Sequence, residues 1–266
     1  MARPHSVRHQ RGFTFVALLC FFLLYLPMAT MVVFAFNAGN TLGDLDGFSL
    51  RWFRAAWQND QIVEALLRSL TVAPVAACLA TIAATMAALA TTRTTPYRGL
   101  AAKVAFLNQP LVVPEIVTAV ALLVVFARIK VWTGYTGLGY LIAAHTAFCI
   151  PFAYLPIRAR LETMDLSLER AAADLYARPW AVFRWITLPL LWPGILAGFM
   201  LAFVVSLDDV VITEFIKSAG QETLPTYMLG QLRRNVTPEM NAISTVFLAI
   251  SVAVVSLFFL LNRKKT

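Results

Sequence analysis

The sequence predicts an all-α polytopic membrane protein with six transmembrane helices, and three observations carry this prediction. Of the 266 residues, 59% are hydrophobic and only 14% are charged, whereas water-soluble domains carry about 25% charged residues. The apolar residues are gathered into long blocks, and Lys and Arg are concentrated in alternate segments between the blocks. A helix that crosses a hydrocarbon core of about 30 Å needs roughly 20 apolar residues.

Six blocks meet or approach this length. In chain order they are Phe13–Phe36, Leu66–Thr91, Val104–Ala127, Leu138–Ile157, Gly194–Ile212 and Ala242–Leu261. Arginines precede the first block, as in a signal peptide. Its apolar core is too long for one, however, and no clear small-residue cleavage site precedes Asn37, so we expect a retained anchor.

The basic residues predict that both ends of the chain are cytoplasmic, because cytoplasmic flanks are enriched in Lys and Arg. With this orientation, 14 of the 22 basic residues lie inside: Arg3, Arg8, Arg11, Arg93, Arg98, Lys103, Arg158, Arg160, Arg170, Arg178, Arg184, Arg263, Lys264 and Lys265. The net charge of +8 is then explained by topology and by anionic membrane lipid. It requires no nucleic-acid partner.

A polar segment, Asn37 to Ala65, follows the first block on the extracytoplasmic side. It contains Trp52, Phe53 and Trp57, and such aromatic side chains favour the membrane interface. Interfacial anchoring is the preferred interpretation, and a lid or a receptor contact is the alternative.

The longest cytoplasmic loop, Leu166 to Pro193, has a helical pattern of its own. We expect two short helices joined by a turn. Ser167 is suited to cap the first helix, and Pro179 is suited to begin the second. Pro189 and Pro193 are expected to end the second helix before the fifth span.

The chain carries no signature of a cofactor, metal or catalytic site. It has no phosphate-binding Gly-x-x-x-x-Gly-Lys-Ser/Thr loop and no Gly-x-Ser-x-Gly turn. Its cysteines are too far apart for a zinc or redox motif. We therefore predict that the protein is not an enzyme, and that any ATP it uses is bound by another chain.

The long cytoplasmic loop resembles the "EAA" motif of permease subunits of bacterial ABC importers, in which Glu-Ala-Ala, three residues, Gly, nine residues and Ile-x-Leu-Pro form the docking element for the ATPase. Ala171, Ala172, Ile186, Leu188 and Pro189 match at the required spacing. Arg170 stands where the family has Glu, and Tyr176 stands where it has Gly. A glycine in a turn permits positive φ, so this turn is predicted to be either αR-compatible or strained.

The similarity covers about Ala65 to Leu261 and is greatest to the spermidine/putrescine permease group, through the run Ser206-Leu-Asp-Asp and the segments around it. It implies the type I permease architecture. It divides the chain into an N-terminal tail, first helix and periplasmic loop (1–64), an ABC transmembrane domain (65–261) with a coupling loop (158–192), and a cytoplasmic tail (262–266).

The resemblance further implies a multi-pass subunit of the bacterial inner membrane, which imports a small solute such as spermidine or putrescine. Its partners would be an ATPase dimer, a second permease subunit and a periplasmic solute-binding protein, besides membrane lipid. The residues implied in ATPase coupling are Glu169, Arg170, Ala171, Ala172, Asp174, Leu175, Tyr176 and Ala177. Packing of this helix on the ends of its own bundle is the alternative.

Within the bilayer the strongest functional signal is the pair Asp208 and Asp209, because ionisable groups there are costly and usually face a bundle interior or a wet cavity. Adjacent helical residues point about 100° apart, so one of the two is expected to face the solute. The alternative is a structural carboxylate. Ser206 and Glu115, which follows Pro114, complete the predicted path or gate. A kink at Pro114 and a packing role for His145 are the structural alternatives there.

A rival function is a self-sufficient transporter in which Asp208 and Glu115 relay protons. The absence of an internal repeat in the sequence disfavours it. Dependence of uptake on a proton gradient would distinguish the two.

Overall fold

The computed structural model describes residues 11–40, 44–234 and 237–263, and within these ranges it is helical apart from one bridge between Asn37 and Phe48. Six of the described helical segments are long and apolar enough to cross a membrane, which confirms the predicted number. They are Gly12–Ala35, Asp60–Thr92, Glu115–Thr133, Gly139–Thr163, Pro179–Asp208 and Pro238–Phe258. Arg3, Arg8, Lys264 and Lys265, which contributed to the predicted orientation, lie outside the described residues.

The chain divides into two compact units, and the first consists of residues 1–60 and 233–252. It carries α1 (Arg11–Ala35), α2 (Arg51–Gln58) and most of α13 (Pro238–Arg263). The apolar side chains of α1 are exposed around the whole helix, as expected of a helix surrounded by lipid. After α1, the Asn37 side chain donates to the Asp44 carbonyl at 2.6 Å and accepts from the Asp46 amide at 2.8 Å, which closes the loop that leads to α2.

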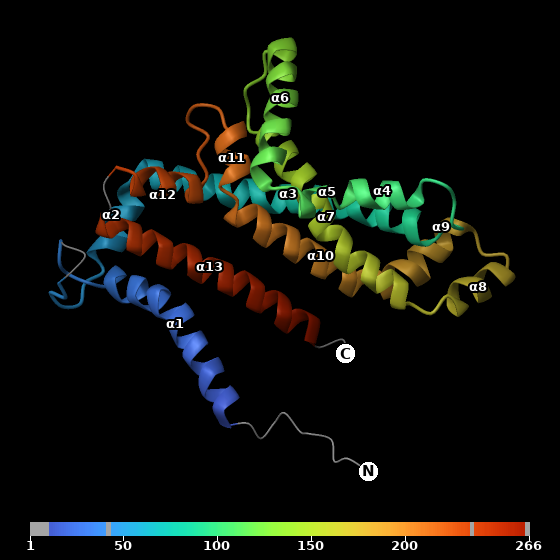
Figure 1. Ribbon diagram of the computed structural model, residues 1–266, viewed down its shortest axis with the longest axis horizontal. Helices are drawn as coiled ribbons and strands as arrows, with labels where there is room; N and C mark the ends of the chain where they lie inside the picture. Colours follow the sequence, from blue (N-terminus) through green and yellow to red (C-terminus); the bar gives the residue numbers. More distant parts are fainter. Residues whose placement is uncertain (1–10, 41–43, 235–236, 264–266) are drawn as a thin grey trace. The chain divides into compact units, whose positions relative to one another are not determined.

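The second unit consists of residues 61–232 and 253–266. Its described helices are α3 (Asp60–Thr92), α4 (Leu100–Leu107), α5 (Gln109–Val112), α6 (Glu115–Thr133), α7 (Gly139–Thr163), α8 (Ser167–Asp174), α9 (Pro179–Val182), the π-helix η2 (Phe183–Thr187), α10 (Leu188–Asp208), α11 (Val211–Ile216) and α12 (Leu224–Leu232). Helices α7 and α10 pack side by side, while α6 and α11 form a second pair that runs across them (Figure 1).

Small residues allow the helices of this unit to approach closely. A Cβ atom on Gly198 of α10 would lie 2.7 Å from the carbonyl oxygen of Ala153 in α7, and one on Gly194 would lie 2.6 Å from Cβ of Arg160. On α3, the side chains of Ala76, Ala77, Ala80, Ala84 and Ala88 are fully buried. Close approach through small side chains is a common way to associate helices in lipid, where apolar burial alone gives little driving force.

The third apolar block was predicted to be one span over Val104–Ala127, and this boundary is wrong. The block contains α4, α5 and the start of α6, and the spanning helix is Glu115–Thr133. Pro114 lies outside the helices with ψ of 134°, and Val113 before it is extended. A proline disfavours helical geometry at the preceding residue and lacks an N–H, so the chain breaks here although it stays apolar.

The fifth span begins earlier than predicted, and the expectation that Pro189 and Pro193 end the preceding helix is wrong. The helix runs from Pro179 to Asp208, with Pro189 in the first turn of α10 and Pro193 inside it. The five residues before α10 form the wider π-helix η2. A proline ring normally clashes with the carbonyl four residues earlier, and the wider turn separates these groups.

Candidate functional site

A cavity of about 410 Å³ lies where α6, α7, α10 and α11 meet, and it brings together three of the four predicted path residues. It is lined by Glu115, Phe148, Phe152, Val204, Val205, Asp208, Asp209, Val210 and Val211. Glu115 is the first residue of α6, directly after the break at Pro114. The break therefore places a carboxyl group at a helix N-terminus on the cavity wall. The fourth predicted residue, Ser206, is buried behind this wall.

Asp209 is held by the protein itself. Its carboxylate accepts hydrogen bonds from the backbone amides of Ile212 at 3.1 Å and Thr213 at 2.8 Å, and from the Thr213 hydroxyl at 2.8 Å. The same carboxylate lies 3.3 Å from Nε2 of His145. These donors satisfy the free amides at the start of α11, as an N-terminal cap does. Asp209 thus fixes the short helix α11 against α7.

His145 completes this network from α7. Its Nδ1 lies 2.8 Å from the Ser206 hydroxyl, and its Nε2 lies 2.9 Å from the Thr213 hydroxyl. Because Thr213 donates its proton to Asp209, it can only accept from His145, so the proton of the imidazole is assigned to Nε2 and Ser206 donates to Nδ1. The contacts agree with the packing role weighed for His145, and they give Ser206 a structural partner.

Asp208 differs from its neighbour. It lies on the cavity wall and is exposed, and among the described residues no hydrogen bond or ion pair to its carboxylate is found. Glu115 is half-buried and lies within reach of the Asp209 carboxyl. Of the adjacent aspartates, therefore, Asp209 is engaged in a structural network, and Asp208 offers an open acceptor to the cavity.

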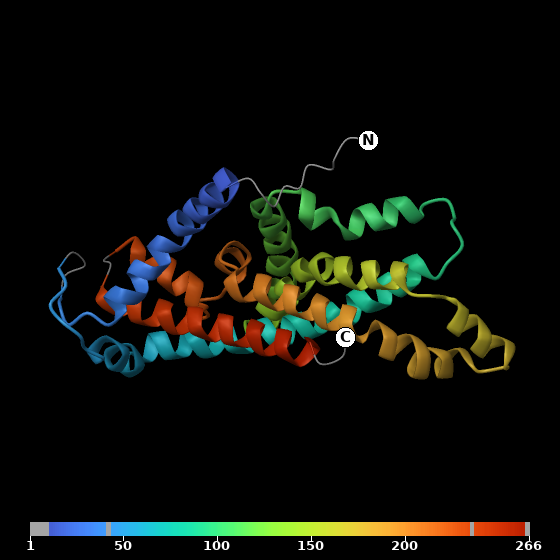
Figure 2. The same ribbon diagram turned by 90° about the horizontal axis from the view of Figure 1, so that it is seen from below.

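The cytoplasmic loop forms two short helices, α8 and α9, which extend beyond the ends of α7 and α10 (Figures 1 and 2). Pro179 begins α9, as predicted. Ser167 does not cap α8 through its side chain. Instead, Asp165 accepts from the Ser167 amide at 2.9 Å and from its hydroxyl at 2.7 Å, and these hydrogen bonds lower the pKa of Asp165.

Tyr176 adopts the left-handed conformation, with φ of 61°. Its amide donates to the Ala173 carbonyl at 2.9 Å, and the Ala177 amide donates to the Ala172 carbonyl at 3.1 Å. This pair of hydrogen bonds is the Schellman ending of a helix, whose left-handed position is usually glycine. Of the two geometries predicted for the turn, the structure has the strained one.

Replacing Tyr176 by glycine is therefore expected to stabilise the folded protein by about 1 kcal/mol, because glycine adopts this φ without a steric penalty. The midpoint of thermal unfolding of the purified protein should rise by about 2 to 4 °C. Tyr176→Ala is the control, since alanine keeps the Cβ atom and should give no such gain. An unchanged midpoint in Tyr176→Gly would contradict the assigned strain.

Glu169 faces the bundle and joins α8 to two other elements. Its carboxylate accepts from the Arg93 guanidinium at 3.2 Å and from the Thr187 hydroxyl at 2.9 Å. Arg93 Nε also lies 3.1 Å from Glu169 Oε2, although without hydrogen-bond alignment, and Arg93 Nη1 donates to the Leu161 carbonyl at 3.2 Å. Arg93 directly follows α3, and Thr187 ends η2. One carboxylate thus connects the end of α3, the first turn of α8 and the start of the fifth span.

The other residues predicted for ATPase coupling lie mainly on the surface of α8 and the turn after it. Arg170, Ala171, Asp174, Leu175 and Tyr176 are exposed, whereas Ala172 and Ala177 are partly buried. The exposed side chains include large apolar groups: Tyr176 is 96% exposed and Leu175 is 82% exposed, and Trp180 and Trp185 add indole rings nearby. Large apolar side chains gathered in this way favour a surface that a partner covers.

Arg93 and Thr187 were missed by the sequence analysis as site residues. Arg93 was counted only as one of the basic cytoplasmic residues, and it lies 76 positions before Glu169. No local pattern announces a pair at that separation. Asp209 offered a weak local signal, since an aspartate three and four residues before the amides of Ile212 and Thr213 is typical of a helix N-terminus.

Comparison with known proteins identifies a family and similar proteins. Residues 80–264 match the model of the binding-protein-dependent transport system inner membrane component family. The chain is 37% identical over 236 residues to the putrescine transport system permease protein PotI of Escherichia coli strain K12, covering 88% of this chain and 84% of that protein. It is 36% identical to the spermidine/putrescine transport system permease protein PotC of Haemophilus influenzae, covering 91% and 92%.

The fold is similar to that of a solved transporter. One chain of a bacterial ABC transporter involved in the import of the acidic polysaccharide alginate superposes with a TM-score of 0.71, at 18% identity, over 97% of each chain.

Proposed function

Because the chain belongs to the binding-protein-dependent transport system inner membrane component family, and is thus a multi-pass permease subunit of an ATP-driven importer without catalytic activity of its own, we propose that the solute it carries is a polyamine. The cavity supports this proposal: Asp208 presents an unpaired carboxylate to it, and Glu115 lies on the same wall. Polyamines carry several ammonium groups at neutral pH, since amines of this kind have pKa values near 10.

An acidic wall attracts such a cation, and more strongly beside a low-dielectric bundle than in water. The phenylalanines Phe148 and Phe152 line the cavity next to the carboxylates. Aromatic faces bind ammonium groups, and apolar side chains suit the methylene chain that separates them. The relatives named for putrescine and for spermidine/putrescine transport support the same class of solute.

The partners belong to the same proposal. A second permease subunit would complete the path, a periplasmic binding protein would deliver the polyamine, and an ATPase dimer would grip the exposed face of α8 and α9. The rigid connection from Glu169 to Arg93 and Thr187 supports transmission of an ATPase movement into α3 and the fifth span. Family membership favours this ATP-driven scheme over a self-sufficient proton-coupled transporter.

The test is polyamine uptake by the complete complex in proteoliposomes containing ATP. We expect Asp208→Asn to lower the uptake of putrescine or spermidine about tenfold, because the side chain keeps its size but loses its charge. Asp208→Glu keeps the charge and should retain most uptake. Both variants should unfold at the temperature of the unmodified protein, since the Asp208 carboxylate makes no structural hydrogen bond among the described residues.

Asp209→Asn is the matched control at the next position. It should lower the unfolding temperature, because an amide cannot replace a carboxylate that only accepts hydrogen bonds. Full polyamine uptake by Asp208→Asn would exclude Asp208 from the path.

A further inference from the structure

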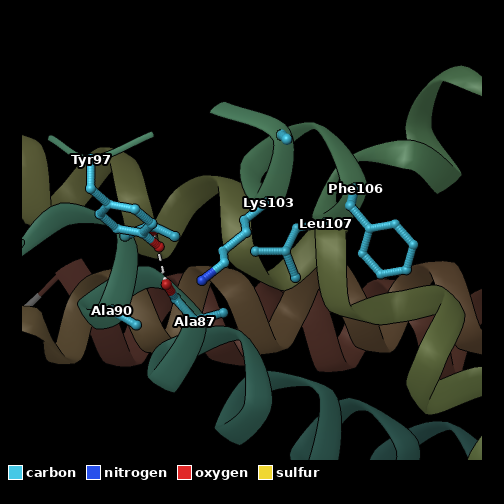
Figure 3. Close-up of a pocket in the computed structure, with 8 residues that line it drawn as sticks. Ala87, Ala90, Tyr97, Lys103, Phe106 and Leu107 are labelled. Carbon is cyan, nitrogen blue, oxygen red and sulfur yellow. Dashed lines mark hydrogen bonds between the residues drawn. The ribbon is translucent and has the colours of Figure 1, made fainter. Parts of the chain in front are cut away.

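A separate groove of about 520 Å³ lies between the last turns of α3 and the helix α4 (Figure 3). Ala87, Ala90 and Thr91 of α3 form one wall, Ala102, Lys103, Phe106 and Leu107 of α4 form the other, and Tyr97 closes one end. The alanines on α3 leave the space open. The groove is almost entirely apolar, and the Lys103 side chain reaches into it between Tyr97 and Leu107 (Figure 3).

The groove lies at the cytoplasmic edge of the membrane. Its wall on α3 belongs to the end of a spanning helix that stops at Thr92. Arg93, the next residue, contacts Glu169 in α8, so the loop between α3 and α4 is on the same side as the cytoplasmic loop. Tyr97 has the apolar ring and polar tip that favour this depth.

The groove also carries positive charge that the protein leaves unbalanced. Between Glu64 and Glu115 the sequence has no acidic residue, but it has Arg68, Arg93, Arg98 and Lys103. Arg93 is neutralised by Glu169. Lys103 makes no ion pair among the described residues, and its ammonium lies 5.0 Å from the centre of the Tyr97 ring.

From these observations we propose that the groove is a binding site for an anionic phospholipid of the cytoplasmic leaflet. The acyl chain lies between the alanines of α3 and the side chains of Phe106 and Leu107, and the phosphate group lies beside Lys103. Arg98 adds a second positive charge to the same short loop. Apolar length with a phosphate at one end matches the groove in both chemistry and membrane depth.

Other occupants fit less well. A polyamine would be repelled by Lys103 and would find no carboxylate, since the lining contains none. An apolar helix of a neighbouring subunit would bury the Lys103 ammonium without an anion, which is costly. The lipid supplies both an apolar chain and the counter-charge.

The test measures lipid retained by the complete complex, purified from membranes in mild detergent and analysed by native mass spectrometry after addition of phosphatidylglycerol or, in parallel, of neutral phosphatidylcholine. We expect bound phosphatidylglycerol to exceed bound phosphatidylcholine. The double variant Arg98→Ala/Lys103→Ala should lower bound phosphatidylglycerol at least threefold and leave phosphatidylcholine unchanged.

Two further variants separate the groove from general surface charge. Ala90→Leu should lower phosphatidylglycerol binding without any change of charge, because Ala90 is exposed and a larger side chain there fills the groove. Arg178→Ala removes one cytoplasmic charge outside the groove and should have no effect.

Equal retention of phosphatidylglycerol in all variants would overturn the proposal and indicate lipid bound around the whole protein. Cross-linking of a cysteine at position 106 to a second permease subunit would also overturn it, because it would show that a protein covers the groove. Neither result depends on which solute is carried.

Discussion

Replacing Arg93 by alanine is expected to lower ATP-driven uptake by the complete complex at least thirtyfold while ATP hydrolysis continues. The substitution removes both the ion pair to Glu169 and the hydrogen bond to the Leu161 carbonyl. It leaves a carboxylate that is four-fifths buried, with an 18% exposed side chain, dependent on Thr187 alone. The loss should cost roughly 2 kcal/mol, between the values for exposed and for buried pairs. Helix α8 could then move without carrying α3 with it.

The measurement compares solute uptake with ATP hydrolysis in the same proteoliposomes, and Arg158→Ala is the matched control. Arg158 also forms an ion pair with a glutamate, at 2.7 Å, but its partner Glu162 lies in the same helix and is exposed. The control should change uptake less than twofold. A double-mutant cycle of Arg93→Ala and Glu169→Ala should be strongly non-additive, because each change removes the same contact. Additive losses would show that the two residues act separately.

Replacing Gly198 by alanine is expected to destabilise the protein by about 3 kcal/mol, the upper part of the range for overpacking. The new Cβ atom would lie 2.7 Å from the Ala153 carbonyl oxygen and 3.0 Å from two atoms of Ile157. A backbone oxygen cannot rotate away as a flexible side chain can. Helices α7 and α10 must therefore separate, and the contact between them is central to the second unit.

Differential scanning fluorimetry of the purified complex should show an unfolding midpoint lowered by about 6 to 12 °C for Gly198→Ala. The control is Gly230→Ala in α12, where nothing lies within 4 Å of the added atom. There the higher helix propensity of alanine should stabilise the protein by up to about 1 kcal/mol. The two substitutions are chemically identical, so midpoints that shift in the same direction would contradict the close packing of α7 and α10.

The number of spans was predictable, whereas two of their boundaries were not. Hydrocarbon thickness sets a minimum length for every spanning helix, so six apolar blocks indicate six helices. Apolar composition, however, does not reveal a break inside a block, and the chain around Pro114 is as apolar as its neighbours. The opposite error occurred at Pro189 and Pro193, where the prolines were read as helix ends although the helix accommodates them.

The candidate site was predictable as a set of residue types but not as a geometry. Asp208 and Asp209 are prominent because charge within an apolar run is costly. Which of the two is free depends on His145 and Thr213, and only the packing of α7 against α10 and α11 brings these partners together. The contact between Arg93 and Glu169 likewise depends on tertiary structure, since 76 positions separate the two residues.

The π-helix at Phe183–Thr187 has a consequence for the direction in which the cytoplasmic loop points. Such a turn holds one residue more than an α-helical turn, so it rotates everything before it by about 100° relative to the helix that follows. Deleting a single residue there would restore ideal α-helical phase. The same deletion would swing Trp180 and the tip at Tyr176 around the axis of α10. The angular register of the ATPase-facing tip is thus set by one supernumerary residue at the membrane boundary.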